Sequence, residues 1–272
     1  MLMTARCAVL GSPVAHSLSP VMHRRAYADL GLDWTYESHD VDEAALPGFL
    51  AGLDESWRGL SCTMPLKQAA LDLADEVDPF ARVVGVANTL VRTERGGWRA
   101  HNTDTTGAVA ALDEQGVGTV SSARVLGGGA TARSLLHGLL VRGLEHVELV
   151  VRDKARVASL AEQVRGERIE VVVREFDAPF LDKVDLLVST VPSDVVRHDA
   201  HDLVDASRAV FDVLYDPWPT ALAATATVHG VPLVTGLDLL AHQAAGQVEL
   251  MTGSTVPAAR LREAAVAELE AR

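Results

Sequence analysis

The chain has 272 residues, 48% of them hydrophobic and 22% charged, which is ordinary for a globular protein and long enough for two domains. Its net charge of −13, with only short basic clusters, argues against nucleic acid or an anionic membrane surface as a partner, because both need a positive surface. An anionic ligand would therefore need a local cationic pocket. No stretch approaches about 18 apolar residues, so no membrane-spanning helix is expected.

The two cysteines bear on the cellular compartment. Cys7 and Cys62 lie far apart in the sequence and neither belongs to a C-x-x-C pair, so we expect neither a disulfide framework nor a metal knuckle. The first residues also lack the apolar block and cleavage site of a secretory signal. These patterns predict a cytoplasmic location, and they leave the oligomeric state open.

The N-terminal segment predicts a strand, a loop and a helix. Arg6 to Leu10 is an apolar strand, and a loop with Gly and Pro follows it. Ser19 followed by Pro20 is typical of a helix start, with Ser19 as the N-cap. Alternatively, Ser17 and Ser19 place two hydroxyls beside a helix N-terminus, where a carboxylate can be held.

Lys67 stands at an unusual place for a cation. After a predicted strand at Thr35 to Asp40 and a short helix at Glu43 to Leu53, residues 59–64 form a strand that Pro65 ends, and Lys67 opens the next helix. A helix N-terminus disfavours positive charge, so a purely solvated lysine has to tolerate a poor position. A lysine directed at an anionic or carbonyl substrate is the interpretation we favour.

Asn88 and Asp104 flank a predicted β-hairpin. Val86 to Arg92 and Trp98 to His101 are short β runs joined by a turn at residues 94–97, with Asn88 in the first run and Asp104 just after the second. Asp104 could simply cap the following helix. It could instead join Asn88 in holding ligand hydroxyls, and the local sequence does not decide between the two.

A glycine-rich loop predicts dinucleotide binding. The spacing Gly127-x-Gly129-x-x-Ala132 fits the pattern G-x-G-x-x-G/A, in which backbone amides and a helix N-terminus approach a pyrophosphate. An apolar strand enters the loop, an amphipathic helix leaves it, and a second strand follows at His146 to Val151. The context is therefore a βαβ unit.

The remaining sequence alternates between predicted strands and helices, which indicates a parallel, doubly wound sheet. The segments in order are His146 to Val151, Asp153 to Val164, Ile169 to Arg174, Asp185 to Thr190, Ala209 to Val213, Thr220 to His229 and Pro232 to Val234. Two closing helices, Leu239 to Leu250 and Pro257 to Glu270, are expected to return to the first domain.

A metal-like run at His198 to Asp202 lacks apolar support, so we expect a solvated loop there and no metal.

The end of the second strand of this unit bears on cofactor choice. An acid there usually binds the ribose of NAD, whereas arginine suits the 2′-phosphate of NADP. Arg152 and Arg156 could clamp that phosphate, while Asp153 is the opposing signal. We favour NADP over NAD.

Ordered motifs over nearly the whole chain resemble the shikimate dehydrogenase family. They are Gly11-x-Pro13-x-x-His16-Ser17-x-Ser19-Pro20-x-Met22-His23, Thr63-x-Pro65-x-Lys67, Gly85-x-x-Asn88-Thr89, Asn102-Thr103-Asp104-x-x-Gly107, Gly127-Gly128-Gly129-Ala130, Tyr215-Asp216-Pro217 and Gly236-Leu237 to Gln243. The resemblance implies reversible, NADPH-dependent reduction of 3-dehydroshikimate to shikimate, in aromatic amino acid biosynthesis. It also implies an α/β fold with the site in the cleft between a substrate-binding domain (1–105 plus 236–272) and a Rossmann-like dinucleotide-binding domain (106–235).

The resemblance also implies roles for individual residues. Ser17 and Ser19 would hold the substrate carboxylate, Thr63, Asn88, Asp104 and Gln243 its hydroxyls, and Lys67 the reacting oxygen, with Tyr215 closing the substrate side near the nicotinamide. Cofactor contacts would come from Gly127, Gly128, Gly129, Ala130, Thr131, Arg152, Asp153, Arg156 and Gly236. The sequence departs from the usual family pattern at Ser61-Cys62, at Val151 and Asp153, and at Asp238-Leu239.

The implied chemistry suits the residues present. Hydride delivery to a ketone produces an alkoxide that must receive a proton, and Lys67 is suited to act as the general acid. Asp104 would orient the ammonium group, so we assign the two as a catalytic pair without deciding which passes the proton.

Three alternatives stay open. An NAD-using quinate/shikimate dehydrogenase would perform the same chemistry, with Asp153 in its favour and the two arginines against it. An amino-shikimate dehydrogenase of secondary metabolism has compatible motifs. A non-catalytic dinucleotide-binding sensor belongs to a different class, and the presence of both Lys67 and Asp104 argues against it.

Overall fold

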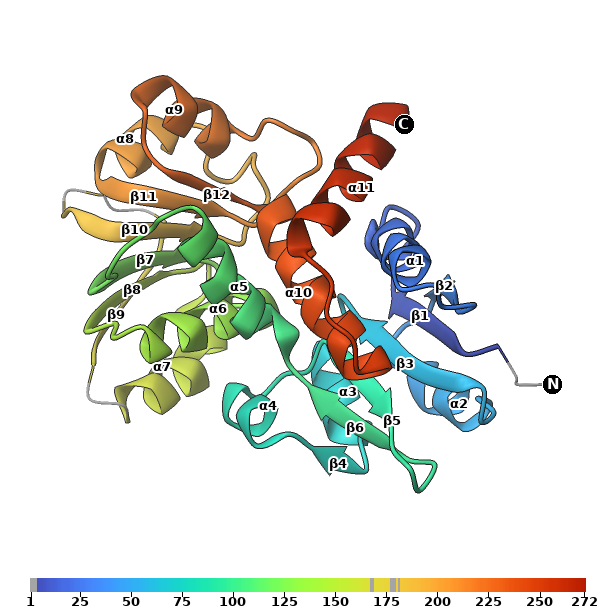
Figure 1. The fold of residues 1–272 in the computed structure, drawn as a ribbon. Coiled ribbons are helices and arrows are strands. Elements are labelled where there is room, and N and C mark those ends of the chain that lie inside the picture. The colour runs from blue at the N-terminus through green and yellow to red at the C-terminus, as the bar shows by residue number, and fades with distance from the viewer. Residues whose placement is uncertain (1–3, 167–168, 177–179, 181) are drawn as a thin grey trace. The chain divides into compact units, whose positions relative to one another are not determined.

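The computed structural model describes residues 4–272 except 167–168, 177–179 and 181, and it divides into two compact units (Figure 1). The first unit comprises Met1–Gly107 and Leu240–Arg272, and the second comprises Ala108–Leu239. The expected boundaries lay a few residues earlier at both crossings. Both crossings fall inside helices, α5 (Thr103–Glu114) and α10 (Gly236–Thr252), rather than in loops.

The first unit is built on a mixed six-stranded sheet with the order β2-β1-β3-β5-β6-β4. Its strands are β1 (Arg6–Gly11), β2 (Thr35–Asp40), β3 (Trp57–Cys62), β4 (Glu76–Val77), β5 (Thr89–Arg92) and β6 (Trp98–His101). β1 is parallel to β2 and β3, whereas β5 is antiparallel to β3 and β6. The predicted hairpin is present, and Gly96 adopts φ +84°, which its turn requires.

Helices pack against this sheet to form its core. The helices of the unit, besides parts of α5 and α10, are α1 (Ser19–Asp29), α2 (Leu46–Ala51), α3 (Lys67–Leu73), α4 (Pro79–Val84) and α11 (Ala258–Ala271). Leu46 and Leu66, at or just before the starts of α2 and α3, pack into an apolar cluster with Leu60 of β3. α10 comes so close to β3 that a Cβ on Gly59 would lie 2.4 Å from the Met251 side chain.

Two predicted details of this unit were wrong. The helix expected over Glu43 to Leu53 is only Leu46–Ala51. Ser19 is not the N-cap of α1 but its first residue, and its backbone N–H donates to the Ser17 hydroxyl at 3.2 Å. Proline lacks an N–H and fits any position of the first turn, so the Ser-Pro pair marked the turn without fixing the cap.

The second unit is a fully parallel six-stranded sheet with the order β12-β11-β10-β7-β8-β9, which confirms the doubly wound prediction. Its strands are β7 (Ser122–Leu126), β8 (His146–Val150), β9 (Glu170–Arg174), β10 (Val184–Ser189), β11 (Ser207–Asp212) and β12 (Leu233–Thr235). Its helices are α6 (Ala130–Val141), the 3₁₀ turn η1 (Lys154–Val157), α7 (Ala158–Arg165), α8 (Ala200–Asp205) and α9 (Ala221–His229), besides parts of α5 and α10.

Two apolar clusters cover the sheet of this unit. One includes Leu136 of α6 and Leu160 of α7, and the other includes Leu203 of α8 and Leu222 of α9. The solvated loop expected over His198 to Asp202 was therefore wrong in part. Residues from Ala200 onward form α8, because Ala200, Leu203 and Val204 recur at helical spacing and are buried.

His23 is a fully buried titratable group in α1. Its Nδ1 lies 2.9 Å from the Ser19 carbonyl oxygen, and its ring stacks on Tyr36 with centroids 4.0 Å apart. Burial lowers the pKa of His23 from its ordinary 6.5 to about 4. The ring is therefore neutral in the folded protein at pH 7 and donates Nδ1–H to Ser19.

We expect stability to fall as the pH drops from 7 to 5. In this window the unfolded chain binds a proton at His23 that the folded protein excludes, so protonation favours unfolding until the folded pKa near 4 is reached. The difference amounts to about 2 kcal/mol for this residue. Urea unfolding of the wild type and His23→Gln at both pH values measures it. An equal pH dependence in the two proteins would contradict the assignment.

Candidate active site

The first unit contains a largely buried ion pair between Lys67 and Asp104. Lys67 Nζ donates to Asp104 Oδ2 at 2.5 Å, and the two side chains are only 13% and 8% exposed. Lys67 is the first residue of α3, and Asp104 lies in the first turn of α5. The structure therefore answers two questions that the sequence left open: Lys67 is not a free surface lysine, and Asp104 pairs with Lys67 rather than capping the helix.

The cap of α5 comes from another residue. Asn102 Oδ1 accepts from the Thr105 backbone N–H at 3.1 Å, and its amide nitrogen donates to the Val86 carbonyl oxygen at 2.9 Å. Asn102 thereby fastens the start of α5 to the chain just before β5. The Asp104 carboxylate remains available for Lys67 and Asn88.

Asn88 lies at the centre of this cluster and is almost fully buried. Its Oδ1 accepts from the Thr103 backbone N–H at 2.8 Å, which fixes the orientation of the amide. Its Nδ2 then faces three acceptors, Asp104 Oδ1 at 2.8 Å, Thr103 Oγ1 at 2.9 Å and Gln243 Oε1 at 3.2 Å. An amide nitrogen carries two hydrogens, so these contacts are shared and can be exchanged for a ligand oxygen.

Thr63, Ser17 and Ser19 lie in the same unit. A Cβ on Gly11 would come 2.3 Å from Thr63 Cγ2, so only glycine lets the loop after β1 pass this close to Thr63. Ser17 and Ser19 lie at the start of α1, where the Ser17 hydroxyl accepts from the backbone N–H of the buried Ser19. In the same unit, the hydroxyl of the buried Tyr36 contacts Ser61 Oγ. Burial raises the pKa of Tyr36 well above its ordinary value, so its hydroxyl stays neutral.

The second unit carries the glycine-rich loop between β7 and α6. Gly127 adopts φ +103°, and a Cβ on Gly128 would lie 2.1 Å from Val157 Cγ1. A Cβ on Gly129 would meet open space instead, and Gly129 is the N-cap residue of α6. Backbone N–H groups at this helix start are therefore accessible to an anion.

A cavity of about 630 Å³ adjoins this loop. Its lining includes the three glycines, Val151 to Asp153 and the segment Thr190 to Pro192 after β10. Arg152 is exposed at this cavity. The Asp153 carboxylate accepts from the Ala155 backbone N–H at 2.9 Å and so caps η1.

The other predicted cofactor residues lie in the same unit. Ala130 and Thr131 start α6, and Arg156 lies in η1, although its side chain is outside the described part of the chain. Gly236 starts α10, where a Cβ would lie 2.2 Å from the Val213 carbonyl oxygen. Tyr215 is half-buried after β11.

Comparison with known proteins identifies the family. Residues 9–90 match the shikimate dehydrogenase substrate binding domain, and residues 236–266 match the shikimate 5′-dehydrogenase C-terminal domain. A shikimate dehydrogenase (NADP(+)) of Methylobacterium radiotolerans is 39% identical over 92% of each chain. The chain belongs to the shikimate dehydrogenase family.

Solved structures of shikimate dehydrogenases are similar to this chain over nearly its whole length. The crystal structure of Mycobacterium tuberculosis shikimate dehydrogenase superposes with a TM-score of 0.89 at 41% identity, covering 97% of this chain and 99% of that one. The Thermus thermophilus enzyme in complex with NADP(H) and shikimate has a TM-score of 0.83 at 34% identity, covering 97% of this chain and 99% of that one.

The buried Gln247 of this shikimate dehydrogenase family member was not predicted from the sequence. Gln247 Nε2 donates to the Asn88 carbonyl oxygen at 3.1 Å and to Thr89 Oγ1 at 3.0 Å, and its Oε1 accepts from Ser61 Oγ at 2.9 Å. The Tyr36 hydroxyl lies 2.5 Å from the same Ser61 oxygen. The available signal was helical spacing, since Gln247 lies one turn beyond Gln243 on the same face of α10.

We expect Gln247→Leu to lower the free energy of unfolding by about 2–4 kcal/mol, because buried oxygens of Asn88 and Thr89 lose their donor. Gln68→Leu is a matched control, since Gln68 is exposed in α3, and it should change stability by less than about 0.5 kcal/mol. Chemical denaturation measures both. Equal values for the two variants would rule out a structural role for Gln247.

Proposed function

We propose that this chain catalyses the reversible, NADPH-dependent reduction of 3-dehydroshikimate to shikimate. The observation that carries the proposal is the largely buried Lys67–Asp104 pair with the Asn88 amide against the carboxylate. The full-length relatives named above are shikimate dehydrogenases, which supports the same reaction and its place in aromatic amino acid biosynthesis.

Lys67 and Asp104 carry the proton chemistry in this proposal. The bound nicotinamide would supply the hydride that reduces the carbonyl carbon. The carbonyl oxygen then gains negative charge, which the Lys67 ammonium stabilises at close range and neutralises by giving up a proton. Asp104 holds the ammonium group in place through the 2.5 Å contact and accepts a hydrogen bond from a neighbouring substrate hydroxyl.

The remaining polar groups orient the substrate. Asn88, Thr63 and Gln243 offer neutral donors and acceptors for ring hydroxyls. Ser17 and Ser19 offer hydroxyl donors for the substrate carboxylate at the start of α1, where the helix dipole favours an anion. Tyr215 has the role of covering the substrate near the nicotinamide.

The second unit suits NADP(H). The cavity beside the glycines lies within the usual size range of cofactor sites, and the open space at Gly129 leaves the α6 N-terminus accessible. Arg152 faces the same cavity and can pair with a 2′-phosphate, and Arg156 follows it in η1. Asp153 already accepts a backbone hydrogen bond in capping η1, which occupies part of its carboxylate.

We also propose a cytoplasmic location, which the two free, buried cysteines support. In the described part of the chain, no helix is long and apolar enough to cross a membrane.

The function is tested by pairing shikimate and quinate with NADP⁺ and NAD⁺ and following formation of the reduced cofactor. Shikimate with NADP⁺ should give the highest kcat/KM of the four pairs. A preference for quinate or NAD⁺ would assign the chain to the broader quinate/shikimate type. Absence of turnover with all four pairs would overturn the proposal in favour of a non-catalytic nucleotide-binding protein.

We expect the double variant Arg152→Ala/Arg156→Ala to bind NADP⁺ at least about 100-fold more weakly, because each charge-assisted contact contributes roughly 1.5–3 kcal/mol. NAD⁺ has no 2′-phosphate, so its Kd should barely change. Titration calorimetry with both nucleotides gives the two values.

The matched control is Arg165→Ala. Arg165 is a half-exposed arginine at the end of α7, 3.6 Å from Glu162, and it does not line the cavity. This variant should bind both nucleotides like the wild type. A parallel loss of NAD⁺ and NADP⁺ affinity in the Arg152→Ala/Arg156→Ala protein would show that these arginines support the fold rather than the phosphate.

A further inference from the structure

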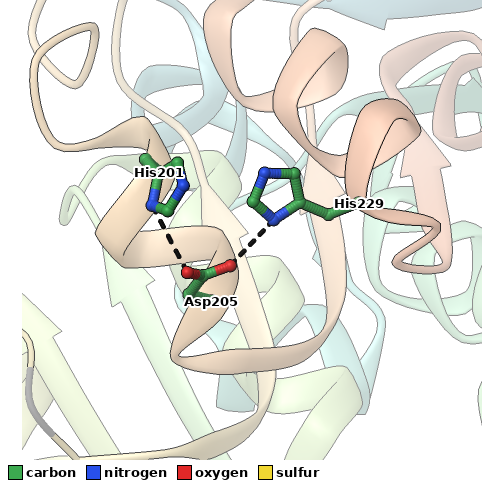
Figure 2. Close-up of side chains that lie close together, drawn as sticks. All are labelled: His201, Asp205 and His229. Atoms are coloured by element: carbon green, nitrogen blue, oxygen red, sulfur yellow. Dashed lines mark hydrogen bonds and ion pairs between the residues drawn. The ribbon is translucent and has the colours of Figure 1, made fainter.

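Two histidines and an aspartate gather on the surface of the second unit (Figure 2). His201 and Asp205 lie one turn apart on α8, and His229 is the last residue of α9. His201 Nδ1 lies 3.3 Å from Asp205 Oδ2, and His229 Nδ1 lies 2.8 Å from Asp205 Oδ1. Figure 2 shows both imidazole rings placed on either side of the same carboxylate.

We propose that His201, Asp205 and His229 form a binding site for a divalent transition metal, and that Zn²⁺ fits it best. The bound metal would join α8 to α9. Two imidazole nitrogens and one carboxylate oxygen are a donor set that zinc prefers, and they leave a fourth position for water. Neither histidine belongs to the catalytic or nucleotide-binding groups described above.

The geometry is close to what zinc needs. Metal–ligand bonds of about 2.0–2.1 Å in a tetrahedral arrangement place the ligand atoms about 3.3 Å from one another. The three ligand atoms here all lie within 4.8 Å of one another, and the two contacts to the carboxylate are 2.8 and 3.3 Å. The side chains of His201 and Asp205 are 67% and 53% exposed, so small rotations can bring the set together without disturbing the core.

Electrostatics also favours a cation. Asp202 Oδ1 lies 3.8 Å from His201 Nδ1, so a second carboxylate adjoins the cluster. Asp205 and His229 are the last residues of α8 and α9, and the C-terminal ends of helices carry partial negative charge. A dication at this position would reduce the repulsion among these groups.

The position of the cluster indicates a structural role. α8 and α9 end just before β11 and β12 begin, so their last residues lie at the edge of the parallel sheet where strands start. The glycine-rich loop follows the end of β7 and lies at the opposite edge. The metal would therefore connect two helices far from the nucleotide site and stabilise the second unit.

Isothermal titration of the metal-free full chain with Zn²⁺ tests the proposal directly. We expect one Zn²⁺ per chain, and a melting temperature that rises with Zn²⁺ concentration, because the ion binds only the folded arrangement. His201→Ala and His229→Ala should each weaken binding at least about 100-fold. Asp205→Asn should weaken it as well, and it preserves the size of the side chain.

His146→Ala is the matched control. His146 is also half-exposed in the second unit and pairs with a carboxylate, Glu170, at 3.2 Å, but among the described residues no second histidine joins it in a metal-like group. This variant should bind Zn²⁺ like the wild type.

Circular dichroism of each variant shows whether it is folded, and Asp205→Asn provides the result if a histidine variant fails to fold. Absence of Zn²⁺ binding, or equal binding by the His201→Ala and His146→Ala proteins, would overturn the proposal, and neither outcome depends on dehydrogenase activity.

Discussion

The buried polar cluster of the first unit depends on the contact between Lys67 and Asp104. Taking either charge out of water alone costs several kcal/mol, so each side chain needs the other where it lies. The helices contribute unequally, because the start of α5 favours Asp104 while the start of α3 disfavours Lys67. The Asp104 carboxylate therefore offsets the unfavourable position of the Lys67 ammonium group at the start of α3.

A chain of hydrogen bonds extends from this pair into the core of the unit. It passes from Asp104 through Asn88 to Gln247, and from there through Ser61 to Tyr36. Satisfied buried networks of this kind specify one arrangement of side chains, because each unpaired member costs free energy. The network fastens α10 to β3 and β5.

Local backbone requirements explain which features could be predicted from the sequence. The glycine-rich loop was recognisable from the spacing of Gly127 and Gly129, because both meet local backbone requirements: Gly127 adopts a positive φ, and Gly129 leaves open space at the start of α6. Lys67 stood out because a cation at a helix start is unfavourable by itself. The parallel sheet of the second unit followed from the alternation of strands and helices.

Features that depend on distant residues could not be predicted. Asp104 was equally consistent with a helix cap, and only the fold brings Lys67 to it while Asn102 takes the capping position. Gln247 reaches Ser61 across a long sequence separation that no local pattern encodes. Likewise, the run His198 to Asp202 did not predict that the His201 ring contacts the His229 ring on another helix.

We propose that Lys67 and Asp104 act as one catalytic unit. A double-mutant cycle with Lys67→Met, Asp104→Asn and the combined variant, measured as kcat/KM for shikimate with NADP⁺, tests it most directly. Residues that act as a unit are strongly non-additive, so the combined variant should lose no more activity than the worse single variant. A combined loss equal to the product of the two single losses would show that the residues act independently and would contradict the account.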